Sequence, residues 1–332
     1  MKTRTLRIML RTVSTLAVVG LAGLAAWFSA SPVDAFVPTG QPARPLRAPP
    51  GAPSAWRAPD WLPASPDLDA LVYGMDARGP ERGPSVSSRA AFVYDLDANR
   101  VLFERNADVV RPVASITKLV SALALVRDGG NLDSGFCVGA AQYPTRSGAP
   151  SHLSTGDCLQ GWDALGAALV ASDNRAAFGL AAVAGQDVDR FVEGMNQVSG
   201  ELGMDRSSWT DPSGLEDENL STARDIARAT VAVAAHPTLS LVSTAPSWDI
   251  VRSNRPTPRR LFSTNRLVGR DGLEFLASKT GYTDTARYCF TSVFRTARGQ
   301  RLVVTLLGAE GKLTRWADMD RILAWVDAQA AG

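Results

Sequence analysis

The chain has 332 residues, of which 45% are hydrophobic and 20% charged, a composition typical of a soluble globular protein. Its 35 basic and 33 acidic residues give a formal net charge of +2, so charge does not indicate nucleic acid or an acidic partner. Two histidines and three cysteines argue against a multi-histidine metal site or a disulfide-dense scaffold, and we expect no metal and no cofactor. The length fits two domains, or one larger domain with appendages.

Residues 1–35 are expected to direct export. The segment opens with four basic residues, Lys2, Arg4, Arg7 and Arg11. An apolar run over residues 13–28 follows, and the small residues near Ala35 predict cleavage after it. Because this run is shorter than the roughly 20 residues of a membrane span, we expect a signal peptide and keep an uncleaved N-terminal membrane anchor as the alternative. Both alternatives place the rest of the chain in the periplasm or cell envelope.

Residues 36–67 and 68–332 differ sharply in composition. The first segment is rich in proline and small residues, which cannot bury enough apolar area to fold, so it is predicted to be an extended linker. The second segment carries regular hydrophobic patterns and is predicted to be the folded catalytic domain. No internal repeat is visible.

Strand patterns lie at the two ends of this body, with helical patterns between them. The first predicted hairpin turns at residues 97–99, and a second turns at residues 298–299. Helices are predicted over residues 114–127, 162–171, 175–184, 188–202, 222–235 and 313–328. This order predicts an α/β (mixed) fold in which one antiparallel sheet is flanked by helices and a helical subdomain is inserted between its halves.

Ser115 and Lys118 lie three residues apart at the start of a predicted helix, so their side chains share one face. Serine is a weak nucleophile until a base takes its proton, and a lysine with a lowered pKa can be that base, whereas arginine cannot. Only four of the 35 basic residues are lysines, namely Lys2, Lys118, Lys279 and Lys312. Taken alone, a surface lysine on an ordinary helix remains the simpler interpretation.

Two further motifs follow in the chain. Ser172-Asp173-Asn174 lies between two predicted helices, where its residue types also suit simple helix capping. Lys279-Thr280-Gly281 lies by the second strand pair, where a turn is the simpler interpretation. Each motif is weak alone, but the three in this order and context are the set found in penicillin-binding proteins and class A β-lactamases.

The chain therefore resembles the serine D-Ala-D-Ala peptidases, the low-molecular-mass penicillin-binding proteins of peptidase family S11. Further segments similar to that family lie at residues 106–108, 191–196, 202–204, 211–215, 221–225, 264–267 and 279–283. Residues 174–177 and 278–281 are closest to the D-alanyl-D-alanine endopeptidase branch. The resemblance implies the β-lactamase/DD-peptidase-like fold. One departure is Arg287, which stands where the family usually has glycine.

The resemblance also implies a role for each catalytic residue. Ser115 would attack a D-alanyl carbonyl of a peptidoglycan stem peptide and form an acyl-enzyme. Lys118 would be the general base, and Ser172 would relay a proton to the leaving amine. β-Lactams would be covalent inhibitors of the same serine.

Five residues are implied in substrate binding: Asn174, Lys279, Thr280, Gly281 and Tyr282. The Asn174 side chain would hold the substrate amide. Lys279 and Thr280 would bind its carboxylate, and the Lys279 charge would help to keep Lys118 neutral. The backbone N–H groups of Ser115 and Tyr282 would form the oxyanion hole.

Two other functions remain as alternatives. A class A-like β-lactamase needs an added glutamate for deacylation, but the acidic residues 216–218 form no Glu-x-x-Leu-Asn motif. A non-catalytic penicillin-binding wall protein would not need the intact motif residues. A histidine-based triad is disfavoured, because neither His152 nor His236 accompanies a Gly-x-Ser-x-Gly elbow.

The three cysteines divide into a predicted pair and a single thiol. In an exported chain, Cys137 and Cys158 are expected to form a disulfide, with three free thiols as the alternative. Cys289 lies in a strand pattern and is expected to be buried. The disulfide would restrain residues 147–155, which we expect to border the active site.

Overall fold

The computed structural model describes residues 62, 74–80, 82–139 and 151–329. The predicted export segment and nearly all of the predicted linker therefore lie outside the described residues. One linker residue, Leu62, is described, and its side chain is buried in the main hydrophobic core. No helix within the described ranges is long and apolar enough to cross a membrane.

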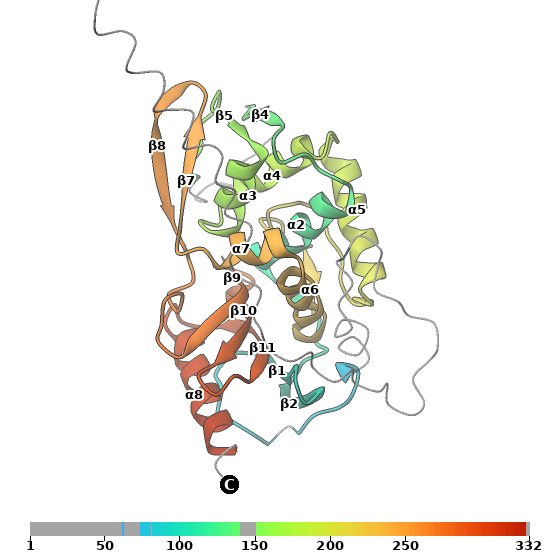
Figure 1. Ribbon diagram of the computed structural model, residues 1–332. Helices are drawn as coiled ribbons and strands as arrows, with labels where there is room; N and C mark the ends of the chain where they lie inside the picture. The colour runs from blue at the N-terminus through green and yellow to red at the C-terminus, as the bar shows by residue number, and fades with distance from the viewer. Residues whose placement is uncertain (1–61, 63–73, 81, 140–150, 330–332) are drawn as a thin grey trace, which may run out of the picture. The chain divides into compact units, whose positions relative to one another are not determined.

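A five-stranded antiparallel sheet joins the two ends of the folded body (Figure 1). Its order is β2-β1-β11-β10-β9, so the strand pair from the start of the body lies against the strands from its end. The strands are β1 (Ala90–Asp95), β2 (Arg100–Arg105), β9 (Leu273–Thr283), β10 (Arg287–Thr296) and β11 (Arg301–Ala309). The predicted split antiparallel sheet is confirmed.

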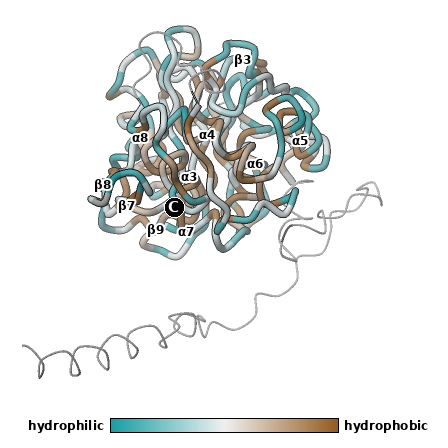
Figure 2. The backbone as a smooth tube through the Cα atoms, turned by 90° about the horizontal axis from the view of Figure 1, so that it is seen from above, coloured by the Kyte–Doolittle hydropathy of each residue, from teal (hydrophilic) through white to brown (hydrophobic). Residues whose placement is uncertain are grey.

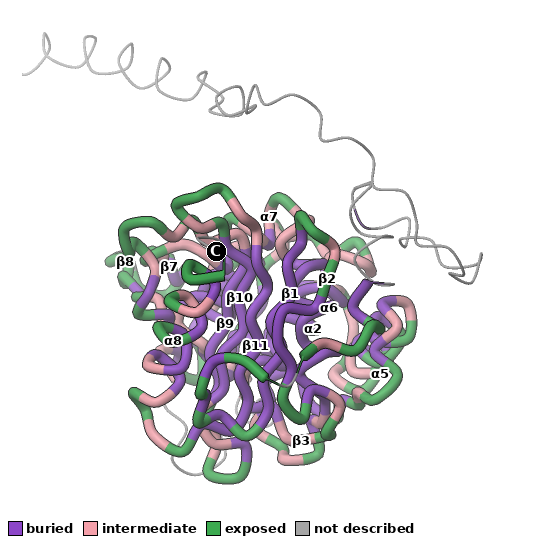
Figure 3. Tube along the Cα trace, turned by 90° about the horizontal axis from the view of Figure 1, so that it is seen from below, coloured by how far each residue is buried: buried purple, intermediate pink, exposed green. Residues whose placement is uncertain are grey.

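Alternating side chains of these strands enter two different hydrophobic cores. In β10, Phe290 and Phe294 pack in the core that includes Trp316. Cys289 and Val293 point to the other face, into the main core. The sheet is thus covered on both faces, and its central strands are buried along their length (Figure 3).

Helices form the two covering layers. α6 (Ala223–Ala235) contacts β1, β9, β10 and β11 on one side of the sheet, and α8 (Thr314–Gln329) contacts β10 and β11 on the other. The inserted helical part comprises η1 (Ala114–Ile116), α2 (Thr117–Arg127), α3 (Gly161–Leu169), α4 (Asn174–Val183) and α5 (Val188–Glu201). All six predicted helices are present. A seventh, α7 (Pro237–Thr244), was not predicted; it begins at a proline, which suits the first turn of a helix.

A long hairpin was also missed by the sequence analysis. β7 (Ser247–Arg252) and β8 (Arg255–Phe262) pair antiparallel and stand apart from the main sheet (Figure 1). β8 is hydrophilic (Figure 2) and lacks the apolar alternation by which a strand is recognised. Two pairs of short antiparallel strands are also present: β3 (Arg111–Pro112) pairs with β6 (Leu220–Ser221), and β4 (Gly135–Cys137) pairs with β5 (Cys158–Gln160).

Candidate active site

Ser115 lies in the short helical turn η1 directly before α2, and its side chain is partly exposed. The preceding residue, Ala114, has a φ of 51°, which is strained for a residue with a Cβ. Two glycines, which lack a Cβ, allow other segments to pack closely against this one. A Cβ on Gly214 would lie 2.0 Å from the Ala114 carbonyl oxygen, and a Cβ on Gly281 would lie 2.8 Å from the Val113 carbonyl oxygen. The segment around Ser115 is therefore packed closely between the turn at Gly214 and strand β9.

The Lys118 amine lies at hydrogen-bond distance from three oxygens. Its Nζ is 2.8 Å from Ser115 Oγ, 2.7 Å from Asn174 Oδ1 and 2.7 Å from the Ser213 carbonyl oxygen. The amide and carbonyl oxygens can only accept, so they take two N–H bonds of the amine. When Lys118 is neutral, its lone pair is left facing the Ser115 hydroxyl. The predicted contact between the serine and the lysine is confirmed, and its geometry suits proton transfer.

The environment of Lys118 favours the neutral amine. Its side chain is fully buried, and this burial lowers the pKa of Lys118 to about 7, against the opposing charges of Asp211 and Asp173. A base with a pKa near neutrality combines a useful neutral fraction with sufficient basicity. Lys118 can therefore act as a general base at physiological pH.

Ser172 and Lys279 meet on the other side of the site. Lys279 Nζ donates to Ser172 Oγ at 2.7 Å and to the Thr280 carbonyl oxygen at 3.1 Å. Lys279 is 1% exposed, and burial, followed by repulsion from Lys118 and Arg315, lowers its pKa. A bound carboxylate would offset both effects and favour the charged ammonium.

Strand β9 brings the third motif beside Ser115. It is an edge strand of the sheet, and its Gly281 lies so close to Ser115 that a Cβ there would be 3.2 Å from the Ser115 nitrogen. Thr280 Oγ1 donates to Thr264 Oγ1 at 2.7 Å, which adds a second hydroxyl. Tyr282 is exposed, and its ring lies against Tyr288. An edge strand of a sheet can bind an extended peptide as an added strand.

Asp173 has the helix-capping role that its residue type suits, and it makes further contacts that were not predicted. Its carboxylate accepts from the Ala176 N–H as the N-cap of α4, so it fixes the helix that begins at Asn174. It also accepts from Ser151 Oγ and from the His152 N–H. Residues 151 and 152 therefore border the site as expected, while residues 147–150 lie outside the described residues.

Asp211 was also missed, although it lies in a segment similar to the family. It is buried and accepts from Ser213 Oγ at 2.5 Å, from the Gly214 N–H at 2.9 Å and from Asn219 Nδ2 at 2.7 Å. These bonds fix the turn that presents the Ser213 carbonyl to Lys118. The only signal in the sequence was the Asp-Pro-Ser-Gly-Leu pattern, which does not reveal that a backbone carbonyl is the functional atom.

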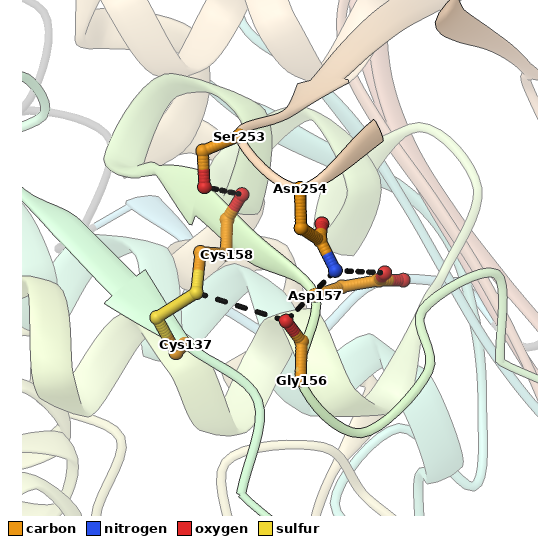
Figure 4. Close-up of a disulfide and its surroundings, with 6 residues drawn as sticks. All are labelled: Cys137, Gly156, Asp157, Cys158, Ser253 and Asn254. Carbon is orange, nitrogen blue, oxygen red and sulfur yellow. Dashed lines mark hydrogen bonds between the residues drawn. A yellow bond between two sulfur atoms is a disulfide. The ribbon is translucent and has the colours of Figure 1, made fainter. Parts of the chain in front are cut away.

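The predicted disulfide is present between Cys137 and Cys158, which join strands β4 and β5 (Figure 4). Their Cα atoms are 4.0 Å apart. Ser253 and Asn254, at the tip of the β7–β8 hairpin, contact the same segment through the carbonyl oxygens of Cys158 and Gly156. The disulfide closes the segment whose Ser151 contacts Asp173.

The remaining predicted features have ordinary structural roles. Cys289 is a buried free thiol whose pKa is raised to about 11 by burial. The His152 ring contacts Arg259, and His236 lies between α6 and α7; among the described residues neither ring is hydrogen-bonded to Ser115. Among the described residues, no cluster of three His, Cys, Asp or Glu side chains could hold a metal ion.

A family model for D-alanyl-D-alanine carboxypeptidases matches residues 77–311. The chain belongs to this family. It is 33% identical to the D-alanyl-D-alanine endopeptidase of Escherichia coli (strain K12) over 246 residues, which cover 74% of this chain and 78% of that protein. It is also 33% identical to the D-alanyl-D-alanine endopeptidase of Pseudomonas aeruginosa over 243 residues, which cover 73% and 78%.

Solved structures of the D-alanyl-D-alanine carboxypeptidase family agree with the fold. The crystal structure of a D-alanyl-D-alanine carboxypeptidase from Mycobacterium tuberculosis H37Rv has a TM-score of 0.67 and 27% identity, and the match covers 74% of this chain and 93% of that one. The predicted family and the predicted DD-peptidase-like fold are both confirmed.

The one departure from the family pattern, Arg287, has a backbone explanation. Its φ is 60°, in the left-handed region that favours glycine. Its guanidinium lies 3.6 Å from Glu310, so it has an ion-pair partner, but its backbone is strained. The turn between β9 and β10 is formed nevertheless.

Proposed function

We propose that the chain is a serine-type D-alanyl-D-alanine peptidase that acts on peptidoglycan stem peptides through an acyl-enzyme on Ser115. The observation that carries this proposal is the arrangement of Lys118, whose two other oxygen partners leave its lone pair to the serine hydroxyl. Membership of the family supports the same reaction.

In the first half of the reaction, the substrate lies along the open edge of β9. Its carboxylate binds Lys279 and Thr280, and the amide before the scissile bond binds Asn174. Lys118 takes the proton of Ser115 as the serine oxygen bonds to the D-alanyl carbonyl carbon. The N–H groups of Ser115 and Tyr282 stabilise the resulting oxyanion.

In the second half, the tetrahedral intermediate expels the amine of the leaving residue. The proton held by Lys118 is delivered to that amine by way of the Ser172 hydroxyl, which accepts one proton as it donates its own. Water then attacks the acyl carbonyl, Lys118 accepts its proton, and the ester breaks to restore Ser115. Lys279 keeps Ser172 in position through their 2.7 Å hydrogen bond.

We further propose that the preferred bond is the cross-link between two stem peptides. The two relatives described above are both D-alanyl-D-alanine endopeptidases, and they support this choice over release of a terminal D-alanine. The test is product analysis after incubation with purified cross-linked dimers and uncross-linked pentapeptides. An endopeptidase converts dimers to monomers, whereas free D-alanine from pentapeptides with dimers left intact would show a carboxypeptidase.

A β-lactamase is the second candidate, and the same site would be acylated by penicillin in both cases. The peptidase proposal expects the acyl-enzyme to persist, because the acidic residues 216–218 form no Glu-x-x-Leu-Asn motif for deacylation. One of them, Asp217, accepts a hydrogen bond from Thr285 at 2.8 Å. Rapid and repeated turnover of penicillin would favour the β-lactamase instead. A non-catalytic wall protein would show neither acylation nor product.

The location of the enzyme follows from the substrate. Peptidoglycan lies outside the cytoplasmic membrane, so we propose that residues 1–35 export or anchor the chain and that residues 36–67 link this segment to a catalytic domain over residues 68–332. Fractionation of cells with an antibody against the catalytic domain tests this proposal. Protein found only in the cytoplasm would contradict it.

A further inference from the structure

Arg315 is a buried cation directly behind the substrate strand. It lies near the start of α8, is 8% exposed, and its Nη1 donates to the Gly281 carbonyl oxygen at 3.1 Å and to the Cys289 carbonyl oxygen at 2.9 Å. The guanidinium lies over the rings of Tyr288 and Trp316, at 5.3 and 4.7 Å from their centroids. Neither of the reaction halves described above uses this side chain.

The surroundings of Arg315 are unusual for a buried arginine. Among the described residues its hydrogen bonds go to backbone carbonyls, and its Nε is buried without a partner. By contrast, the buried Arg224 is paired with the carboxylates of Glu104 at 2.6 Å and Asp108 at 2.8 Å. Burying a guanidinium without a carboxylate partner costs free energy, so we expect Arg315 to have a role in function as well as in stability.

The geometry of one peptide unit connects Arg315 to the nucleophile. The Gly281 carbonyl and the Tyr282 N–H belong to the same trans peptide, so they point in opposite directions. Arg315 also bonds Cys289 of β10, which pairs with Gly281, and therefore approaches the carbonyl from the β10 side. The Tyr282 N–H then points away from β10, to the edge of β9 that has no partner strand, and η1 with Ser115 packs against β9.

We propose that Arg315 is a positioning residue of the oxyanion hole, which orients and polarises the Gly281–Tyr282 peptide so that its N–H binds the developing oxyanion more strongly. This inference rests on the proposed function. A cation bonded to a carbonyl draws electron density from the amide and makes its N–H a better donor, since linked hydrogen bonds polarise one another. The fixed positive charge also stabilises negative charge on the far side of the peptide.

A purely structural tether between α8 and the sheet would predict a different outcome. Loss of such a tether would lower the stability of the fold, but the carbonyl of an acyl-enzyme would remain in the same electrostatic environment. The carbonyl stretching frequency of the acyl-enzyme separates the two roles, because it reports polarisation of the C=O bond by the oxyanion hole.

The test uses the full chain with benzylpenicillin as the probe. The variants are Arg315→Gln, which removes the charge, and Arg315→Lys, which keeps the charge and tests the inference if the glutamine variant fails to fold. Arg224→Gln is the matched control, because it removes a buried guanidinium away from the site. The rate of acylation and the infrared stretch of the acyl carbonyl are measured for each protein.

We expect acylation to fall about 10-fold in Arg315→Gln, less than on complete loss of an oxyanion donor, and the stretch to move to higher wavenumber. Arg315→Lys should give intermediate values of both, and Arg224→Gln should lose thermal stability with an unchanged stretch. If the wild-type protein is acylated but the stretch of the acyl carbonyl is unchanged in the Arg315 variants, this inference alone is overturned. A wild-type protein that takes up no penicillin would overturn the proposed function and the inference together.

Discussion

Lys118 and Lys279 are both buried lysines, yet their surroundings fit them for opposite charge states. Lys118 faces two acceptor oxygens and one hydroxyl, an arrangement that a neutral amine satisfies with two N–H bonds and one lone pair. Lys279 contacts Ser172 and lies beside Thr280, where a substrate carboxylate would add the missing negative charge. In a chain where most basic residues are arginine, a lysine at each of these two positions suits the charge state that the position favours.

The first prediction concerns replacement of each lysine by arginine. Arginine cannot give up its proton, so Lys118→Arg should lower the rate of acylation by about 1,000-fold, in the range expected for loss of a general base. Lys279→Arg keeps the positive charge and should lower it by only about 10-fold, because hydrogen bonding to the carboxylate is retained in part. Labelling kinetics with a fluorescent penicillin measure both, and equal losses in the two variants would contradict the roles assigned.

The second prediction concerns pH. Burial lowers the pKa of Lys118 to about 7, and the neutral form is the base. The acylation rate should therefore rise with pH through about 7 and fall by about 10-fold for each pH unit below it. Stopped-flow measurements with penicillin between pH 5 and 8 test this, with circular dichroism to confirm that the fold persists. A rate that is flat over this range would show that a different group limits the reaction.

The third prediction concerns the strain at Arg287. Glycine at this position would relieve the left-handed φ of 60°, so Arg287→Gly should raise the free energy of unfolding by about 1 kcal/mol. Arg287→Ala is the control, because it removes the ion pair with Glu310 but keeps the Cβ and hence the strain. Denaturant unfolding of both variants measures the difference. Equal stabilities of the glycine and alanine variants would show that strain is not the cause.

The side chains of the site were predictable from the sequence, and the resemblance implied the N–H groups of Ser115 and Tyr282, but the functional backbone carbonyl groups were not predictable. Ser115, Lys118 and Lys279 could be found because serine and lysine at these spacings carry a recognisable chemistry. Asp211 and Arg315 act through the carbonyl groups of Ser213 and Gly281, which every residue possesses. Their positions depend on how distant segments fold together, and no local pattern reveals this.

At the scale of elements, the strands of the main sheet and the six amphipathic or buried helices were predicted because their apolar residues follow regular periods. The β7–β8 hairpin was not, since its strand from Arg255 to Phe262 is largely exposed and contains two prolines. Its position instead depends on contacts such as that of Arg255 with the buried Asp157, 3.1 Å apart. These are long-range interactions that composition does not indicate.

The fourth prediction belongs to this scale and concerns the disulfide between β4 and β5. Its reduction should lower the free energy of unfolding by about 3 kcal/mol, as expected for a closed loop of this size. Because the closed segment holds Asp173 through Ser151, acylation should also slow severalfold. Denaturant unfolding and penicillin labelling, each with and without reductant, measure these effects.

Two variants separate the disulfide from the free thiol. A Cys289→Ala protein keeps the disulfide, so the reductant should still lower its stability. A protein with both Cys137→Ala and Cys158→Ala should not respond to the reductant at all. If wild-type stability is the same with and without a reductant that breaks the disulfide, the proposed stabilisation is wrong.

At the scale of the whole molecule, the site lies where edge strand β9 meets the inserted helical part of the chain. Ser115 comes from η1 directly before α2, Asn174 from the start of α4, the Ser213 carbonyl from a turn before β6, and Lys279 from edge strand β9. The sheet fixes β9, and the packing of Gly281 and Gly214 against residues 113–114 fixes the helix start relative to it. The fold thus brings Lys118 to Ser115 and Lys279 to Ser172.

The central claim is that Ser115 forms the acyl-enzyme, and the most direct measurement is mass spectrometry of the protein after brief incubation with benzylpenicillin. We predict one covalent adduct per chain, located by peptide mapping on the peptide that contains Ser115, and its absence in Ser115→Ala. The adduct should also be absent when unlabelled substrate peptide is present in excess. An adduct on another residue, or wild-type protein without any adduct, would contradict the account.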